Sequence, residues 1–345
     1  MFGLSRYAGC VLVCCLIMSI PPHALDVEAP PPSSSDSGEI PLTAGTWPFS
    51  RYASAQALDQ FLRLRATGTP PTGSSIEETR HFYDRMNTDR VERLKKLFPV
   101  QVESDVIAGV PVDLVIPIGG VPFRNRDRVL INLHGGAFLW GARSGGLVES
   151  IPIASLGQIK VISLDYREGP EYKFPAASVD VETVYAALLR NYRPRNIGIY
   201  GTSAGGVLTA ESVAWMTAHG VPAPGAIGML CGSALDLEGD SVSLAQRLTG
   251  TTTAQTLRLI ELPYFKGADP HDPLLFPGNS KAVLARFPTA LLITASRDFA
   301  MSSVLRTHEL LAQAEVSAEL HVFEGMWHAF PALQVRSGDI IVQGR

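Results

Sequence analysis

The sequence predicts an α/β fold in which a mostly parallel central sheet is flanked by helices and carries a helical cap. From residue 129 onward, short apolar segments of strand length alternate with helical segments. Most of these strands are apolar throughout, as strands covered on both faces are. The chain has 345 residues, of which 46% are hydrophobic and 18% charged. That length fits one large core with a modest cap as well as it fits two smaller domains.

The expected strands begin with a hairpin, residues 100–107 and 110–116, on either side of Ala108-Gly109. Parallel strands are then expected at residues 129–133, 159–164, 197–200, 226–231, 290–294 and 319–323. The helices of this region are expected near residues 145–157, 176–191, 204–219 and 302–315. Residues 236–288 interrupt the alternation and are long enough for a cap insertion. The α/β core is therefore expected at residues 100–235 and 289–345.

Residues 46–99 are expected to form the N-terminal helical part of the cap. Ser54 fits the N-cap of a first helix, and a second helix is expected from Ser75 to Leu97, where Pro99 ends it. The apolar side chains that set the helical spacing are Leu58, Phe61, Leu62, Phe82, Met86, Leu94 and Leu97.

The N-terminal segment has a different character from the rest of the chain. Arg6 precedes an apolar run at residues 7–20, and two prolines and a small residue follow it. This pattern is typical of a secretory signal, and the run is short for a membrane span of about 20 residues. We interpret residues 1–24 as a signal peptide or N-terminal anchor and residues 25–45 as a flexible linker. The expected location is secreted or periplasmic, and membrane association through residues 7–20 is the alternative if the segment stays uncleaved.

Charge and cysteine content narrow the function classes. The net charge is −4, without a global excess of lysine or arginine, which argues against a nucleic-acid partner. Cys10, Cys14 and Cys15 lie in the N-terminal segment, so Cys231 has no partner for an internal disulfide in the mature chain. Cys231 ends an apolar run and is expected to be a buried packing residue rather than a catalytic thiol. No metal site is expected.

A glycine-rich turn carries the candidate nucleophile, Ser203. Residues 201–206 read Gly-Thr-Ser-Ala-Gly-Gly, between an expected strand and an expected helix. A serine on such a turn projects its hydroxyl above the sheet, and its neighbours must be small. An ordinary glycine-rich turn with an incidental serine is the alternative. A phosphate-binding loop is disfavoured, because Val207-Leu208 stand where that loop requires lysine and then serine or threonine.

A second glycine-rich turn, His134-Gly135-Gly136, follows the strand expected at residues 129–133. Ester hydrolysis passes through a tetrahedral intermediate whose oxygen becomes negative, and backbone N–H groups stabilise that oxygen. We expect the N–H groups of Gly135, Gly136 and Ala204 to form this oxyanion hole, with Ala204 at a helix N-terminus. The ring of His134 is expected to brace the loop rather than to act as a base.

His328 and Asp298 complete the candidate catalytic site. A serine hydroxyl needs a base, and His328 lies in a loop directly after the last expected strand. Asp298 also follows an expected strand, at the same end of the sheet as Ser203. Its carboxylate would orient the imidazole and stabilise the protonated form. Helix capping is the alternative role for Asp298, and Glu324 and Asp269 are rival acids.

Together these motifs resemble the hormone-sensitive-lipase-like esterases, often called bacterial family IV. Residues 134–136 resemble the HGG loop of that family, and residues 201–206 resemble its GTSAGG variant. Residues 165–167, 170–171 and 174–177 resemble its DYR, PE and FPAA segments, and residues 267–274 resemble its cap-to-core sequence. The resemblance implies the α/β-hydrolase fold, no cofactor, and hydrolysis of short- to medium-chain esters through an acyl-enzyme. It also implies a small-molecule ester substrate, a cap and a homodimer.

Two features depart from the family pattern. Phe299 stands where a proline commonly follows the acid, and the short segment after His328 does not read as the usual long closing helix. Two other functions also remain open at this point. The same residues would serve amide, formamide or lactone hydrolysis, because the cap recognises the leaving group. A non-catalytic ligand-binding protein on this fold is the other hypothesis.

Overall fold

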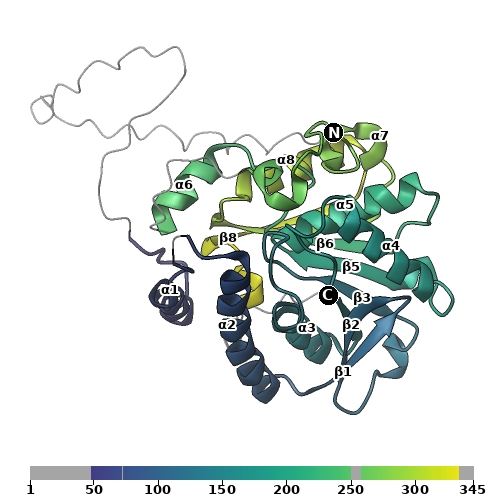
Figure 1. Cartoon of the computed structure of the whole chain (residues 1–345), viewed down its shortest axis with the longest axis horizontal. Helices are drawn as coiled ribbons and strands as arrows, with labels where there is room; N and C mark the ends of the chain where they lie inside the picture. The colour runs from purple at the N-terminus through teal and green to yellow at the C-terminus, as the bar shows by residue number, and fades with distance from the viewer. Residues whose placement is uncertain (1–47, 72, 250–257, 334–345) are drawn as a thin grey trace, which may run out of the picture. The chain divides into compact units, whose positions relative to one another are not determined.

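The computed structural model describes residues 48–71, 73–249 and 258–333, and an eight-stranded sheet lies at the centre of this part of the chain (Figure 1). The strand order is β1-β2-β4-β3-β5-β6-β7-β8. Strand β2 runs antiparallel to both β1 and β4, and all other neighbouring strands are parallel. The predicted α/β fold with a mostly parallel sheet is therefore confirmed.

The strands lie close to the segments that the sequence predicts. They are β1 (Val100–Ile107), β2 (Val110–Pro117), β3 (Val129–Leu133), β4 (Lys160–Leu164), β5 (Ile197–Thr202), β6 (Ala226–Leu230), β7 (Thr289–Arg297) and β8 (Ala318–Trp327). The largest differences are at the carboxyl ends of β7 and β8, which extend beyond the predicted strands by three and four residues. Both extensions lead toward the candidate site.

Helices cover both faces of the sheet, as Figure 1 shows. They are α1 (Ala55–Thr67), α2 (Ile76–Leu97), α3 (Ser144–Gly157), α4 (Ala176–Leu188), α5 (Ala204–Ala218), α6 (Asp240–Thr249), α7 (Lys281–Leu284) and α8 (Met301–Gln313). Helices α4, α5 and α8 share one large buried cluster with the sheet. Helices α2 and α3 share a second cluster with the opposite face. The helices predicted between the core strands are thus confirmed.

Strand β3 illustrates why the apolar strands occupy the centre of the sheet. Val129, Ile131 and Leu133 point into the cluster with α4 and α5, whereas Leu130 packs on the side of α2 and α3. Successive side chains of a strand alternate between the two faces. Because both faces are covered by helices, apolar side chains occupy both faces, and the buried Asn132 is the polar exception.

Helices α1 and α2 begin where their capping residues predict. The Ser54 hydroxyl accepts a hydrogen bond from the backbone of Ala57 at the start of α1. Ser75 and Glu78 form a capping box at the start of α2, in which each side chain accepts from the backbone N–H of the other. These caps satisfy N–H groups that have no partner within a helix.

The buried faces of these two helices include only some of the apolar side chains that set the helical spacing. Helix α1 buries Ala57 and Phe61, whereas Leu58 and Leu62 are 38% and 54% exposed. Helix α2 buries Asn87, Val91 and Leu94, whereas Leu97 is exposed. The apolar side chains named from the sequence lie on these two helices, but not all of them face the core, because the packed face depends on where the core touches each helix.

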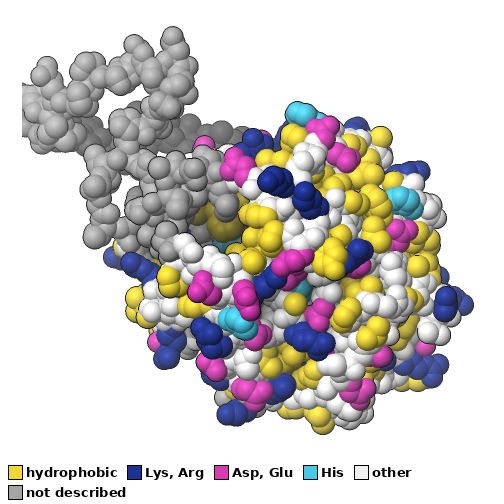
Figure 2. All heavy atoms as spheres, in the orientation of Figure 1, with side chains coloured by type: hydrophobic (Ala, Val, Ile, Leu, Met, Phe, Trp, Pro, Cys, Tyr) yellow, Lys and Arg dark blue, Asp and Glu magenta, His cyan; other side chains and the backbone are white. Residues whose placement is uncertain are grey.

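The segment predicted as a cap insertion contains α6, the short 3-10 helices at Leu259–Glu261, Pro263–Phe265 and Pro277–Asn279, and α7. No helix in the described part of the chain is long and apolar enough to cross a bilayer. The predicted signal peptide or anchor, the linker and the segment after residue 333 lie outside the described residues. On the face shown in Figure 2, basic and acidic side chains are interspersed among apolar ones.

Because β3, β5, β7 and β8 are parallel, their carboxyl ends meet at one edge of the sheet. Each of these four strands is followed by a residue or loop that the sequence singles out. These are the loop after Leu133, the serine after Thr202, the aspartate after Arg297 and the histidine after Trp327. The topology thus gathers all the predicted site residues at this edge.

Candidate active site

Ser203 occupies a strained turn between β5 and α5. Its backbone has φ 58° and ψ −122°, a region that side-chain-bearing residues rarely adopt. A Cβ atom at Gly205 would lie 1.7 Å from the carbonyl oxygen of Leu133, so this position accepts only glycine. The close approach of the turn to β3 therefore explains why small residues surround the serine in the sequence.

The structure brings the hydroxyl of Ser203 together with His328 and Asp298. His328 Nε2 lies 2.8 Å from Ser203 Oγ, and His328 Nδ1 lies 2.6 Å from Asp298 Oδ1. These distances place the hydroxyl as a donor to Nε2 and the Nδ1–H group as a donor to the carboxylate. His328 is separated from Asp298 by 30 positions along the chain and from Ser203 by 125, so only the fold makes these contacts.

Asp298 is fully buried and held by several donors. Besides His328, the N–H of Ala300 and the hydroxyl of Thr294 donate to its carboxylate, at 2.9 and 2.7 Å. Burial acts to raise the pKa of Asp298. The charge of His328 and these hydrogen bonds outweigh burial, so the pKa of Asp298 lies below its ordinary value. The carboxylate is therefore ionised over the range in which an imidazole can act as a base.

An irregularity in the β7–β8 pairing lies beside the acid and the base. Ala295 pairs with Phe323, but Arg297 pairs with Trp327, so the register shifts between the two pairs. The Ser296 hydroxyl accepts the N–H of Gly325 at 2.7 Å and fixes the irregular segment. Such irregularities redirect side chains near active sites, and here the strands lead directly into Asp298 and His328.

The loop after β3 differs from the expectation at Gly135. The N–H of Gly135 donates to the Glu149 carboxylate at 2.9 Å, so this group is engaged and its predicted role as an oxyanion donor is corrected. Among the described residues, the backbone N–H groups of Gly136, Ala137 and Ala204 meet no hydrogen-bond acceptor. A Cβ atom at Gly136 would lie 1.6 Å from the carbonyl oxygen of Trp140. Glycine at this position therefore lets the loop fold tightly.

Ala137 was missed by the sequence reasoning, although a signal for it was present. It directly follows the two glycines and continues the same turn, with a positive φ of 53°. Glu149 was also missed. It lies on the helix that follows the loop in the chain, and nothing in its local sequence marks it as a partner of Gly135.

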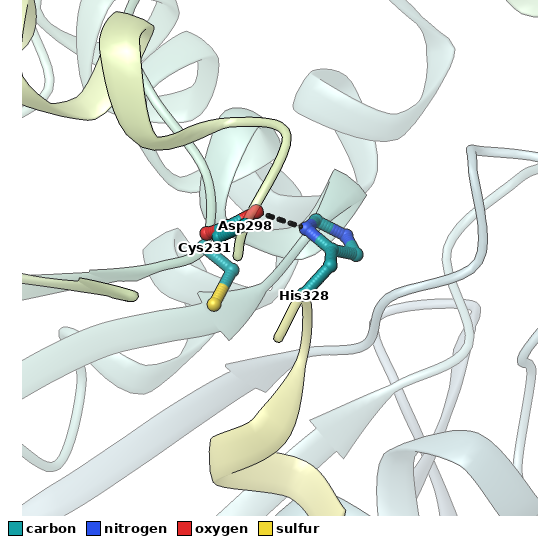
Figure 3. Close-up of side chains that lie close together, drawn as sticks. All are labelled: Cys231, Asp298 and His328. Carbon is teal, nitrogen blue, oxygen red and sulfur yellow. Dashed lines mark hydrogen bonds and ion pairs between the residues drawn. The ribbon is translucent and has the colours of Figure 1, made fainter. Parts of the chain in front are cut away.

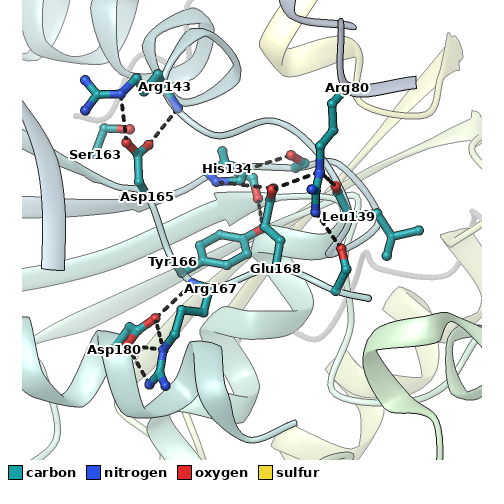
Figure 4. Close-up of polar contacts among 12 residues, drawn as sticks. Arg80, His134, Leu139, Arg143, Ser163, Asp165, Tyr166, Arg167, Glu168 and Asp180 are labelled. Carbon is teal, nitrogen blue, oxygen red and sulfur yellow. Dashed lines mark hydrogen bonds and ion pairs between the residues drawn. The ribbon is translucent and has the colours of Figure 1, made fainter. Parts of the chain in front are cut away.

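His134 is fully buried, and its contacts lie away from the hydroxyl of Ser203. Its ring stacks on Tyr166, with centroids 4.2 Å apart, and its Nδ1 lies 2.9 Å from the carbonyl oxygen of Gly135. The Tyr166 hydroxyl donates to the carbonyl oxygen of His134 at 2.7 Å (Figure 4). Burial lowers the pKa of His134 to about 4, so the ring is neutral near pH 7. These contacts fit a bracing role for this ring.

Arg80 links α2 to the loops around the site (Figure 4). Its guanidinium donates to the carbonyl oxygens of Leu139 and Gly169, at 2.8 and 2.7 Å, and to both carboxylate oxygens of Glu171. Glu168 lies within 3.9 Å of the same guanidinium. Helix α2 is thus joined by one side chain to the loop that begins at His134 and to the segment resembling the PE motif.

The two rival acids and a further histidine on β8 have other surroundings. Glu324 and Asp269 are exposed, and Asp269 accepts the backbone N–H of His271. His321 pairs with Glu319 on β8, at 2.8 Å. Three aromatic residues of the predicted cap insertion are each at most 1% exposed and belong to the main core cluster; they are Tyr264, Phe265 and Phe276. They act in packing.

Cys231 is buried, as predicted, and lies beside the acid and the base. Figure 3 shows its side chain next to Asp298, which points toward His328. The ligand atoms of these three residues lie within 4.8 Å of one another. Burial and the neighbouring Asp298 raise the pKa of the Cys231 thiol well above its ordinary value. A metal would need a thiolate and would compete with the hydrogen bond between Asp298 and His328, so this group suits catalysis by the imidazole better.

A family profile described as the alpha/beta hydrolase fold matches residues 130–332. LipR of Mycobacterium tuberculosis, named as a putative acetyl-hydrolase, is 30% identical over 227 residues, which cover 65% of this chain and 71% of LipR. An esterase of Acinetobacter venetianus is 27% identical over 247 residues, which cover 70% of this chain and 79% of the relative. The chain therefore resembles relatives whose names denote ester hydrolysis.

Solved structures give the same result. The crystal structure of esterase E25 matches with a TM-score of 0.75 and 31% identity, over 87% of this chain and 94% of E25. The structure of an esterase from the bacterial hormone-sensitive lipase family matches with a TM-score of 0.68 and 24% identity, over 81% of this chain and 91% of that one. At 24% identity, the similarity to this second structure is evidence for the shared fold alone. The chain therefore belongs to the alpha/beta hydrolase fold family and is a carboxylesterase, in agreement with its resemblance to the hormone-sensitive-lipase-like esterases.

Proposed function

We propose that this carboxylesterase acts through an acyl-enzyme on Ser203, with His328 as the base and Asp298 as the acid that orients the imidazole. The observation that carries the proposal is the continuous hydrogen-bonded chain from Asp298 through His328 to the hydroxyl of Ser203, with contacts of 2.6 and 2.8 Å. In this order, the carboxylate fixes the tautomer that leaves Nε2 free to accept a proton.

The proposed reaction has two halves. Ser203 Oγ attacks the ester carbonyl carbon while His328 Nε2 takes the hydroxyl proton, and the carbonyl π electrons move onto oxygen. The tetrahedral intermediate then collapses, and the alcohol leaves with the proton from His328. A water molecule, deprotonated by the same imidazole, attacks the acyl-enzyme carbonyl; the bond to Ser203 Oγ then breaks, Oγ takes the proton back from His328, and the carboxylic acid is released. The chain's own side chains supply every proton transfer in this cycle.

The proposed oxyanion donors are the N–H groups of Gly136, Ala137 and Ala204. All three are free of acceptors within the described residues, and they lie on the two turns that meet beside Ser203. Ala204 is the first residue of α5, where positive partial charge collects. A negative oxygen bound between the two turns would meet donors that need no rearrangement.

The proposed substrates are esters with short to medium acyl chains. The names of the acetyl-hydrolase and esterase relatives support this class. A rate profile with p-nitrophenyl acetate, butyrate, hexanoate, octanoate, decanoate and laurate tests it. We expect kcat/KM to be highest among the shorter chains and to fall toward laurate. A maximum at laurate would contradict the proposed class, and a matched butyryl amide in the same assay tests the preference for esters over amides.

The nucleophile is tested with Ser203→Ala. We expect this variant to fold like the parent and to lose nearly all turnover of p-nitrophenyl butyrate. The reason is that, in the described part of the chain, the hydroxyl bonded to His328 Nε2 is that of Ser203. Near-parental turnover by a folded Ser203→Ala variant would exclude Ser203 as the nucleophile.

A further inference from the structure

Glu149 lies beneath the site and has no part in the mechanism above. It projects from α3 and is buried, at 8% exposure. Its Oε1 atom accepts the N–H of Gly135 at 2.9 Å, and its Oε2 atom accepts the side-chain amide of Asn132 at 3.0 Å. A buried carboxyl group is costly to keep unless such contacts offset its lost hydration.

The carboxyl group of Glu149 lies where two separate turns meet. Gly135 belongs to the loop that carries the Gly136 and Ala137 donors, and Thr202 directly precedes Ser203 and the Ala204 donor. The two turns touch at this point. A Cβ atom at Gly135 would lie 2.9 Å from the carbonyl oxygen of Thr202 and 3.3 Å from the Cβ atom of Ser203. The same Cβ atom would lie 3.6 Å from Glu149 Oε1, so the carboxyl group lies at the junction between the loop and the nucleophile turn.

We propose that Glu149 is a positioning residue that holds the oxyanion loop in register with the nucleophile turn, by accepting the Gly135 N–H at the point where the two turns touch. This inference rests on the proposed function, because it concerns donors assigned there. The engaged Gly135 N–H fixes the direction in which the next N–H groups point. A shift of the loop by a fraction of an ångström would misplace these donors relative to the oxyanion, and such shifts reduce catalysis strongly.

The hydrogen bond from Gly135 requires an oxygen atom at position 149 that accepts the N–H group, and it does not require a negative charge. In Glu149→Gln, the side-chain oxygen can still accept from Gly135. The introduced NH2 group would face the NH2 group of Asn132, but the Asn132 side-chain amide can flip so that its oxygen and nitrogen exchange places. The Asn132 oxygen would then accept from the introduced NH2 group, and the Asn132 nitrogen would donate to Ser163, whose hydroxyl already contacts Asn132 at 3.1 Å. The glutamine variant therefore keeps the contact that matters.

Two other substitutions remove that contact. Glu149→Asp keeps the charge but withdraws the carboxylate by about 1.5 Å, one carbon–carbon bond, which breaks the contact with Gly135. Glu149→Leu removes both acceptors. We expect kcat to stay within about fivefold of the parent in Glu149→Gln and to fall by about 10- to 100-fold in the other two variants. KM should change little, because the donors act in the transition state.

The control is Glu211→Leu. Glu211 is a fully buried glutamate on α5, and no hydrogen bond among the described residues joins its side chain to either turn. Its substitution reports what loss of a buried carboxyl group does to stability alone. Circular dichroism and thermal melting identify the variants that fold. If Glu149→Leu does not fold, the kcat values of Glu149→Gln and Glu149→Asp decide whether Glu149 positions the loop.

An alkyl trifluoromethyl ketone reports on the oxyanion directly. Ser203 Oγ adds to its carbonyl carbon, the hydroxyl proton moves to His328, and the carbonyl oxygen becomes the oxyanion, so binding is reversible and mimics the tetrahedral intermediate. We expect the Ki of the ketone to rise in Glu149→Asp and Glu149→Leu by the same factor by which kcat falls. Glu149→Gln and Glu211→Leu should bind it within about fivefold of the parent.

Three results would overturn the proposal. They are a higher kcat for Glu149→Asp than for Glu149→Gln, parental kcat in a folded Glu149→Leu variant, and a fall in kcat without loss of ketone affinity. The Ser203→Ala variant distinguishes failure of the positioning role of Glu149 from failure of the proposed catalytic assignment. If Ser203→Ala is inactive while the Glu149 series fails, only the positioning role is wrong; if Ser203→Ala stays active, the catalytic assignment itself is wrong.

Discussion

The imidazole of His328 stacks on the ring of Phe299, with ring centroids 3.8 Å apart and planes inclined by 23°. Phe299 directly follows the acid, Asp298, so one short segment contacts the imidazole both through a carboxylate and through an aromatic face. The ring restricts the orientation of His328, and its negative face also favours the cation that forms when His328 takes the serine proton.

We therefore expect Phe299→Leu to lower kcat by about three- to tenfold, because an aromatic contact of this kind contributes about 1 kcal/mol. Steady-state kinetics with p-nitrophenyl butyrate measures the change. Phe323→Leu removes a ring of the same size from β8, away from His328, and should leave kcat close to the parent. Equal losses in the two variants would show that the effect is one of general packing.

Substitution of the acid should be far more damaging. In Asp298→Asn the carboxylate that fixes the His328 tautomer is lost, and we expect kcat to fall by about 10³- to 10⁴-fold while the protein stays folded. Glu324→Gln, which removes the exposed rival acid, serves as the control and should turn over at the parental rate. If Glu324→Gln were the more damaging change, the acid would have to be reassigned.

Glu168 gives a prediction about pH and stability. Burial raises the pKa of Glu168 to about 7, against the opposing charge of Arg80. The ordinary value is 4.5, so between these two values the folded protein holds a proton that the unfolded chain releases. The free energy of unfolding therefore falls as the pH rises through this window.

The cost of ionising Glu168 above the window is on the order of 3 kcal/mol, and Glu168→Gln avoids it. We expect the melting temperature of Glu168→Gln to exceed that of the parent at pH 8, and the difference to shrink or reverse at pH 5. Thermal melts at the two pH values measure this. The same difference at both pH values would mean that Glu168 does not change its protonation state across this range.

Arg80 should contribute to stability and to the geometry of the site together. Arg80→Lys keeps the charge but lacks the planar fork that reaches Leu139, Gly169 and Glu171 at once. We expect a loss on the order of 2 kcal/mol in the free energy of unfolding, accompanied by a change in KM as α2 loosens from the loop. Chemical denaturation and steady-state kinetics measure the two effects. The control is Arg63→Lys, since Arg63 pairs with Asp59 on an exposed face of α1 and such pairs contribute little.

Much of the fold could be predicted because its signals are local. Each apolar strand and each helix has its pattern within a window of a few residues, and the serine turn carries its own steric requirement in residues 201–206. The order of motifs along the chain then indicated which strand ends carry Ser203, Asp298 and His328. The structure brings these three side chains into contact.

The remaining features depend on contacts between distant segments. Glu149 and Arg80 acquire their roles from what α3 and α2 face in the fold, and neither has a local motif. The same reason explains the error at Gly135, because the acceptor of its N–H lies on α3 and not in the loop itself. The exposed Leu58 and Leu62 also show that helical spacing finds a helix without finding the side that the core covers.

The most direct test of the central claim is to trap the acyl-enzyme and locate the acyl group. The protein is mixed with p-nitrophenyl butyrate, quenched in acid within the first turnovers, digested and examined by mass spectrometry. We expect a butyryl group on the peptide that contains Ser203, with none in Ser203→Ala. A butyryl group carried by another residue, or ester turnover by Ser203→Ala at the parental rate, would contradict the account.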